Sequence, residues 1–177
     1  LSEASGNKYM VFLTCCFIYY DDIIDSQKIS LNLKKICIEY TFYFFEQVSN
    51  NYESIQDISQ KYLEKVNFDI NPDINRIIEK TNRILNIFFN LYRKEQNPKI
   101  LHSILNLFRT EVTTSKIQHN RTNKDNVELL LKCTIQKSEQ SVLAILQCLY
   151  PELDCQKDNI LDLIYKFSFL SQLLDDL

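Results

Sequence analysis

The stretch MVFLTCCFIYYDDIIDSQ, residues 10–27, decides the fold that this chain is expected to adopt. Its almost wholly apolar run Met10 to Tyr20 leads directly into Asp21, Asp22 and Asp25. In a helix Asp21 and Asp25 lie one turn apart on one face, and Asp22 lies about a third of a turn from Asp21. Carboxylates gathered at the end of a buried helix repel one another, and Mg²⁺ would relieve this repulsion. On this motif alone, an acidic helix end without a function is the alternative.

The composition of the chain predicts an all-α protein. Its 177 residues include one Gly (Gly6) and three Pro, and 45% of them are hydrophobic. Sheet proteins of this length need more turn residues than that. The length suits one domain with a substantial core, and no repeat or linker divides it. We therefore expect a single antiparallel helical bundle over residues 1–177.

Charge and hydropathy narrow the classes of partner. The 20 basic and 23 acidic residues give a net charge of −3, which removes any general argument for nucleic acid binding. The run Met10 to Tyr20 is about half the length of a membrane span, so we expect no transmembrane segment. The chain also starts without a secretory signal of the usual kind, and we expect a cytoplasmic protein.

The six cysteines contain no C-x-x-C pair and lie mostly in apolar runs. We interpret them as small buried side chains in a reducing compartment, with disulfides or metal ligation as the alternative. The two histidines, His102 and His119, are predicted to lie at the surface.

Apolar periodicity and capping residues predict seven helices. Ser30 is typical of a helix N-cap, and Pro72 and Pro98 each follow an Asn, as at a first helical position. The aromatic residues 42–45 are predicted to belong to the core rather than to a ligand site. The expected helices cover residues 7–26, 31–48, 55–66, 72–95, 98–119, about 125–150 and about 158–174.

A second acidic pair closes the last of these helices. Asp175 and Asp176 follow the apolar residues 160–174, as Asp21 and Asp22 follow the first apolar helix. Two core helices that each end in carboxylates could face each other across the mouth of one cavity. This pairing is more specific than either cluster alone.

These motifs resemble those of the all-α class I isoprenoid synthases, most closely the trans-polyprenyl diphosphate synthases. The sequence YYDDIIDS is similar to the DDxxD motif of that family, and SQLLDDL is similar to its second aspartate motif, with Ser171 in place of a Phe. Lys137 and Ser138 resemble a Lys-Thr pair, and Gln118 falls where the family commonly has a Gln that faces the cavity. The resemblance spans about Asn7 to Leu177 and includes divergent isoprenyl transferases that modify a bacterial quorum-sensing pheromone.

The resemblance implies a helical bundle around a central cavity and a Mg²⁺-dependent prenyltransferase that ionises an allylic isoprenoid diphosphate. It implies isopentenyl diphosphate or another acceptor as second substrate, and a homodimer. Phe17 would limit the length of the prenyl chain, with Cys16 beside it. The remaining implied residues are the metal ligands Asp21, Asp22, Asp25, Asp175 and Asp176 and the diphosphate-binding or cavity residues Lys137, Gln118 and Gln172.

The chain also departs from the family pattern. Paired arginines that hold isopentenyl diphosphate should follow DDxxD, but Gln27, Lys28 and Ile29 stand there, and the first Arg is Arg76. N-terminal helices and the third aspartate of the second motif are expected to lie outside this sequence. A terpene cyclase, which needs no second diphosphate, is therefore one alternative. A non-catalytic partner subunit of a prenyl synthase is another, although such a subunit would have no reason to keep the acidic cluster.

Overall fold

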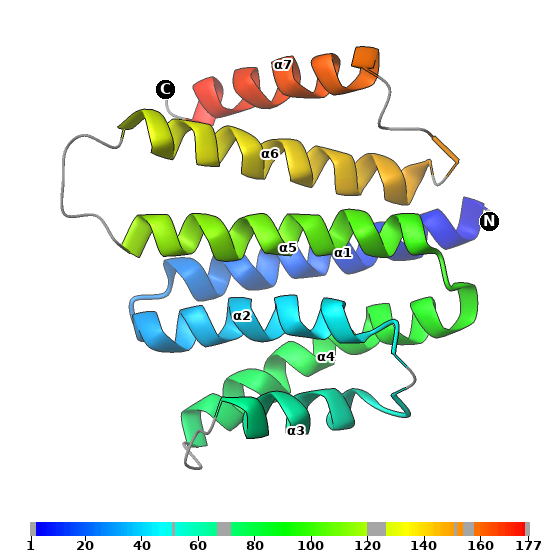
Figure 1. Cartoon of the computed structure of the whole chain (residues 1–177), viewed down its shortest axis with the longest axis vertical. Coiled ribbons are helices and arrows are strands. Elements are labelled where there is room, and N and C mark those ends of the chain that lie inside the picture. Colours follow the sequence, from blue (N-terminus) through cyan, green and yellow to red (C-terminus); the bar gives the residue numbers. More distant parts are fainter. Residues whose placement is uncertain are drawn as a thin grey trace. The chain divides into compact units, whose positions relative to one another are not determined.

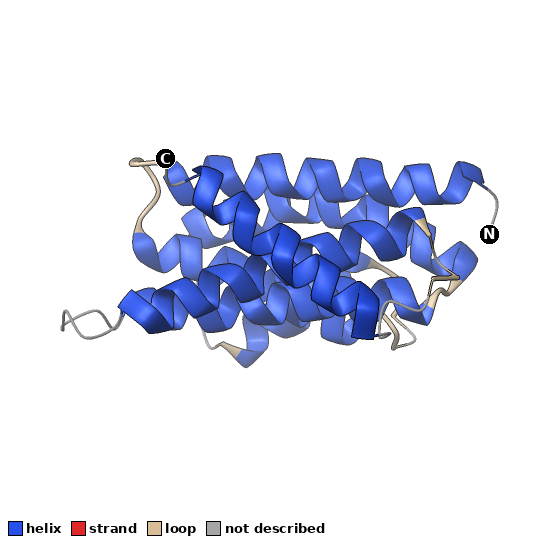
Figure 2. Cartoon of the chain, turned by 90° about the horizontal axis from the view of Figure 1, so that it is seen from above, coloured by secondary structure: helices blue, strands red, loops and turns tan. Residues whose placement is uncertain are grey.

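The computed structural model of the chain is built from helices (Figure 1). It describes residues 3–50, 52–66, 72–119, 127–150, 152–153 and 158–175. These residues form seven helices and no strand, so the predicted all-α class is confirmed. Figure 2 colours the described residues as helix and loop alone. The helices are α1 (Glu3–Asp25), α2 (Leu31–Gln47), α3 (Ile55–Lys65), α4 (Pro72–Glu95), α5 (Pro98–His119), α6 (Val127–Leu149) and α7 (Asp158–Asp175).

The helices divide into two units. The N-terminal unit is Asn7–Asn97 and holds most of α1 together with α2, α3 and α4. The C-terminal unit is Pro98–Leu177 with Leu1–Gly6, and it holds α5, α6 and α7. That both units form one bundle around a central cavity stays a prediction.

Local sequence signals explain the starts of three helices. The Ser30 side chain accepts a hydrogen bond from the Leu33 amide and so caps α2, and α4 and α5 begin at Pro72 and Pro98 as predicted. The helix α1 begins at Glu3, earlier than the predicted start near Asn7.

Aromatic side chains hold α1 against α2 and α4. The Phe88 ring, on α4, lies 5.7 Å from the Tyr9 ring and 5.2 Å from the Phe12 ring, both on α1, measured between ring centroids. It also lies 5.1 Å from the Phe45 ring of α2. All four side chains are buried to 1% exposure or less. Aromatic pairs in these tilted and edge-on arrangements gain stability beyond their buried area.

A polar contact fixes the C-terminal half of α1 on the same two helices. The Tyr19 hydroxyl lies 2.9 Å from Oγ1 of Thr81, which is buried on α4, and the Tyr20 hydroxyl contacts Thr41 of α2. Since Oγ1 of Thr81 also lies 3.4 Å from Sγ of Cys37, α1, α2 and α4 meet at this threonine.

The core predicted for residues 42–45 is confirmed for Phe44 and Phe45, which are buried, while Phe42 and Tyr43 are half-buried. Tyr43 still packs inside the N-terminal unit, because its ring lies 5.4 Å from the ring of Tyr62 on α3.

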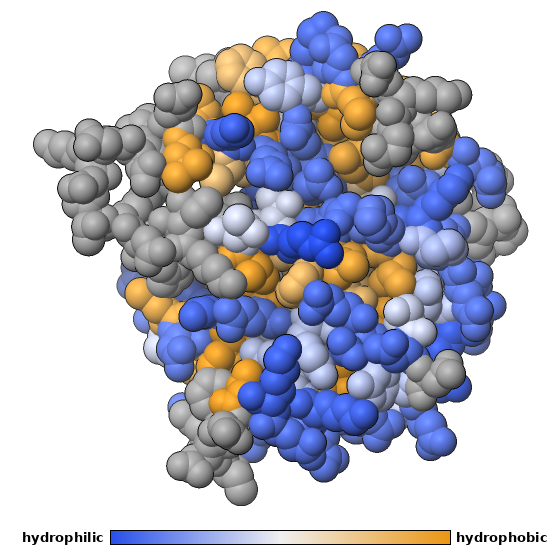
Figure 3. Space-filling view, in the orientation of Figure 1, coloured by the Kyte–Doolittle hydropathy of each residue, from blue (hydrophilic) through white to orange (hydrophobic). Residues whose placement is uncertain are grey.

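In the C-terminal unit, α6 contacts both α5 and α7 (Figure 1). The apolar sequence of α7 predicts a core helix, but only Ile164 and Ser168 are buried among its described side chains. Figure 3 shows hydrophobic surface over α7, because its apolar residues surround the helix while α6 covers one side. The exposed large hydrophobic side chains of α7 are Leu163, Tyr165, Phe167, Phe169 and Leu170.

The described cysteines are free. Cys16, Cys37, Cys133 and Cys148 are buried, and Cys15 is half-buried. No helix in the described part of the chain is long and apolar enough to cross a membrane.

Replacement of Phe88 by Ala should lower the free energy of unfolding by about 3–5 kcal/mol, because it removes the ring that joins α1 to α2 and α4. Urea denaturation followed by circular dichroism measures the change. Phe167→Ala is the matched control, since the Phe167 side chain is 61% exposed, and it should change stability by no more than about 0.5 kcal/mol. Equal effects of the two substitutions would contradict the assigned core.

Candidate functional site

The acidic end of α1 emerges from the core of the N-terminal unit. Tyr20 and Ile23 are buried, whereas Asp21 and Asp22 are exposed, and neither carboxylate forms an ion pair with a described cation. Asp25 is the last residue of α1, and its side chain lies outside the described part of the structure. The helix therefore presents at least two unpaired carboxylates to solvent at one end.

A lysine from α2 compensates part of the unfavourable charge at this helix end. Nζ of Lys34 donates a hydrogen bond to the carbonyl oxygen of Ile24. A cation is favourable at a helix C-terminus, where carbonyl groups lack partners and the helix dipole is negative. This compensating contact was not predictable from the sequence, because Lys34 lies on another helix.

The two described aspartates differ in their surroundings. Consecutive helical residues project about 100° apart. Asp22 shares a helical face with Tyr19, three residues earlier. Both line a pocket of about 760 Å³, together with Ile23 and Ser26, and Asp21 does not line it. The two aspartates of the DDxxD motif therefore lie on different surfaces: Asp22 lines the pocket, and Asp21 is exposed outside it.

The pocket, which we call the α1/α4 pocket, lies between the C-terminal end of α1 and the first half of α4. Asp22 and Asp73 bring negative charge to it. Its positive side chains outnumber these two carboxylates, although the whole chain carries a net charge of −3. The cationic residues of the pocket are Lys28, Arg76, Lys80 and Arg83.

These cations were not predicted as site residues from the sequence. Arg76, Lys80 and Arg83 follow one another at spacings of four and three on α4, which places them on one helical face. This spacing can be recognised in the sequence as a basic stripe beside the buried stripe of α4. The sequence does not show that this basic stripe lines the same pocket as Asp22, which is more than fifty residues earlier in the chain.

Tyr19 borders the pocket as a neutral phenol. Burial is the main cause that raises the pKa of its hydroxyl above the ordinary value, and the nearby Cys37 thiol adds to this, while the hydrogen bond with Thr81 acts in the opposite direction. Tyr19 can therefore donate or accept a hydrogen bond at neutral pH, but it brings no negative charge to the pocket.

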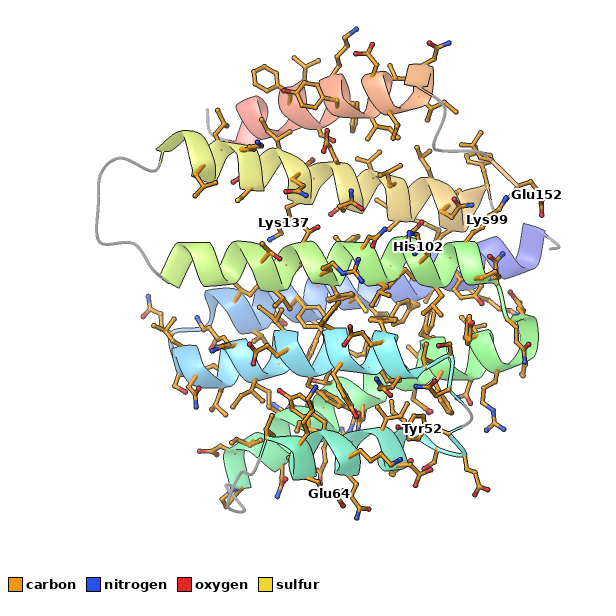
Figure 4. The ribbon with its side chains drawn as sticks, viewed as in Figure 1. Tyr52, Glu64, Lys99, His102, Lys137 and Glu152 are labelled. Atoms are coloured by element: carbon orange, nitrogen blue, oxygen red, sulfur yellow. The ribbon has the colours of Figure 1, made fainter. Side chains whose placement is uncertain are left out.

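Lys137 has a partner that the sequence did not predict. Its Nζ lies 3.0 Å from Oε1 of Glu111, so this ion pair joins α6 to α5 within the C-terminal unit. Figure 4 shows Lys137 on the side of α6 that faces α5. Its assignment as a diphosphate ligand stays a prediction, and any diphosphate would compete with Glu111 for it.

The other predicted site residues are placed only in part. Cys16 is buried and Phe17 is half-buried on α1. His102 is exposed, as predicted, and its Nε2 lies 3.0 Å from Nδ2 of Asn106. The side chains of the remaining predicted residues lie outside the described part of the structure, as does all of Asp176: Gln118, His119, Gln172, Asp175 and Asp176.

The donor chemistry at the end of α1 fits Mg²⁺ in kind. Asp21 and Asp22 offer hard carboxylate oxygens in contact with solvent, and Mg²⁺ prefers a few such ligands with water in its other positions. Among the described side chains no three His, Cys, Asp or Glu residues gather as a metal site. A complete site would thus need Asp25 or the second aspartate pair.

A scan against protein-family models, a search of curated proteins and a search of solved structures each find no significant match to this chain.

A double-mutant cycle tests the ion pair between Lys137 and Glu111. Lys137→Met and Glu111→Gln, alone and together, should show a coupling free energy of about 0.2–1 kcal/mol in urea denaturation, since both side chains are partly exposed. The control cycle combines Lys137→Met with Glu139→Gln, two positions apart on α6, where side chains do not face each other. Coupling as large in the control cycle would contradict the specific pair.

Proposed function

We propose that the chain is a Mg²⁺-dependent prenyltransferase that acts on an allylic isoprenoid diphosphate. The observation that carries this proposal is the pair of exposed, unpaired carboxylates Asp21 and Asp22 at the end of a helix whose preceding turns are buried. An exposed acidic pair at a helix C-terminus is unfavourable for folding, and a bound cation is a direct reason to keep it.

Asp21, Asp22 and Asp25 would be metal ligands, and we propose Asp175 and Asp176 as further ligands. When bound, Mg²⁺ supplies Lewis-acid stabilisation of the diphosphate that leaves the allylic carbon. Lys137 would exchange its contact with Glu111 for a diphosphate oxygen, and Gln118 and Gln172 would orient the substrate through hydrogen bonds.

The remaining requirement is a dry surface for the allylic cation, because water would quench it. Apolar side chains on the last turns of α1 meet this requirement next to the carboxylates. Ile23 is buried directly after Asp22, and Phe17 is half-buried one turn before Asp21. We propose Phe17 as the residue that limits the length of the prenyl chain.

Asp21→Asn should lower kcat by about a hundredfold or more, because it removes a metal-holding oxygen that acts on developing charge. Folding should stay intact or improve slightly, since one like-charge repulsion is lost. The matched control is Asp162→Asn on α7, where the exposed carboxylate pairs with Lys166 on the same helix. Wild-type turnover in Asp21→Asn, at equal thermal stability, would refute the assignment.

Product analysis separates a prenyltransferase from a terpene cyclase. The protein is incubated with farnesyl diphosphate and Mg²⁺, with and without isopentenyl diphosphate, and the products are separated by chromatography. We expect a longer diphosphate only when isopentenyl diphosphate is present, and no product in chelator. A hydrocarbon or alcohol formed equally well without isopentenyl diphosphate would favour the cyclase.

A further inference from the structure

We propose that the α1/α4 pocket binds the phosphate or diphosphate group of a small ligand with a short apolar part, and that it does so without a metal. This inference goes beyond the proposed function and does not depend on prenyl transfer. It rests on the convergence of cationic side chains from two separate segments on one pocket of the N-terminal unit.

The arrangement of the cations suits an oxyanion. Arg76, Lys80 and Arg83 share one face of α4 over about 10 Å of helix length. Lys28 joins them from the segment between α1 and α2. Arginine and lysine together offer both the forked and the point-charge donors that phosphate oxygens accept.

These cations are available to a ligand. Within the described part of the chain, none of them forms an ion pair with a carboxylate. Basic residues on an exposed helix are often simply solvated. Here, however, they border a pocket of about 760 Å³ and give it an excess of positive charge in a chain with a net charge of −3. Asp22 and Asp73 offset part of the like-charge repulsion among these four cations, and a bound anion would offset the rest.

Apolar side chains in the same pocket indicate that the ligand is more than an inorganic anion. Ile23 and Ile77 are buried beside it, and Ile29, Leu33 and Ile84 are half-buried there. A short hydrocarbon group attached to the phosphate would cover these side chains and gain affinity in proportion to the apolar area removed from water. The chemical class is therefore a small amphiphilic phosphate or diphosphate ester.

The test is a calorimetric titration of the full chain with inorganic diphosphate in the presence of a chelator. The double variant Arg76→Gln/Lys80→Gln should bind about tenfold more weakly or worse than the wild type, because two charge-assisted contacts are lost. Lys94→Gln is the matched control, since Lys94 is an exposed cation of α4 that does not line this pocket, and it should bind as the wild type does. Equal loss in both proteins, or no binding by the wild type, would overturn the proposal.

Further arms define the ligand and guard against a folding artefact. A phosphate monoester with a short alkyl chain should bind more tightly than inorganic phosphate, and equal affinities would overturn the apolar part of the proposal. Arg83→Gln should repeat the loss at an unchanged melting temperature, and wild-type affinity in that variant would contradict its place in the site. Binding to anionic phospholipid vesicles without binding of diphosphate would identify a membrane surface instead and refute the small-ligand site.

The Asp21→Asn variant separates this inference from the proposed function. Asp21 does not line the pocket, so this variant should bind inorganic diphosphate in chelator as well as the wild type does. Loss of metal-free binding in Asp21→Asn would contradict the assignment of that binding to the pocket. If the wild type is inactive but still binds diphosphate through Arg76 and Lys80, the proposed prenyltransferase function is refuted and the anion site stands.

Discussion

The packing of α1 against α2 and α4 is the constraint on which the candidate site depends. The Phe88 ring lies against aromatic rings from both of the other helices, and Thr81 on the same helix contacts the Tyr19 hydroxyl near the acidic end of α1. These contacts fix the rotation of α1 about its axis. Because that rotation is fixed, Asp22 lines the α1/α4 pocket while Asp21 projects elsewhere.

The electrostatics of the site combine two opposite features. Unpaired carboxylates end α1, and a larger number of cations border the pocket beside Asp22, yet no described ion pair joins the two groups. A metal ion at the carboxylates and an anion at the cations would each relieve a like-charge repulsion. A diphosphate with Mg²⁺ is one ligand that meets both needs, which is why the proposed function and the metal-free anion site are compatible but separable.

Much of the fold could be predicted from local sequence. Ser30, Pro72 and Pro98 mark helix starts through capping and the fixed φ of proline, and these signals need no tertiary information. The acidic end of α1 was also recognisable as a candidate site, because carboxylates at a helix C-terminus are unfavourable for the helix dipole. The contacts between helices were not predictable, since they arise from packing between different segments of the chain. Examples are the hydrogen bond from Lys34 to the Ile24 carbonyl, the ion pair of Lys137 with Glu111, and the pocket that Arg76 and Asp22 both line. For α7 the apolar pattern predicted burial, but the pattern does not say how many neighbours a helix has, and in the C-terminal unit α6 covers one side.

The most direct test of the account is a calorimetric titration of the full chain with a bisphosphonate, a stable analogue of diphosphate, in Mg²⁺ and in chelator. We expect the bisphosphonate to bind about tenfold more tightly, or better, with Mg²⁺ than in chelator. Asp21→Asn should remove this enhancement and leave the weaker metal-free binding unchanged. Equal affinity in Mg²⁺ and in chelator would contradict the claim that the carboxylates at the end of α1 form a metal site for a diphosphate substrate.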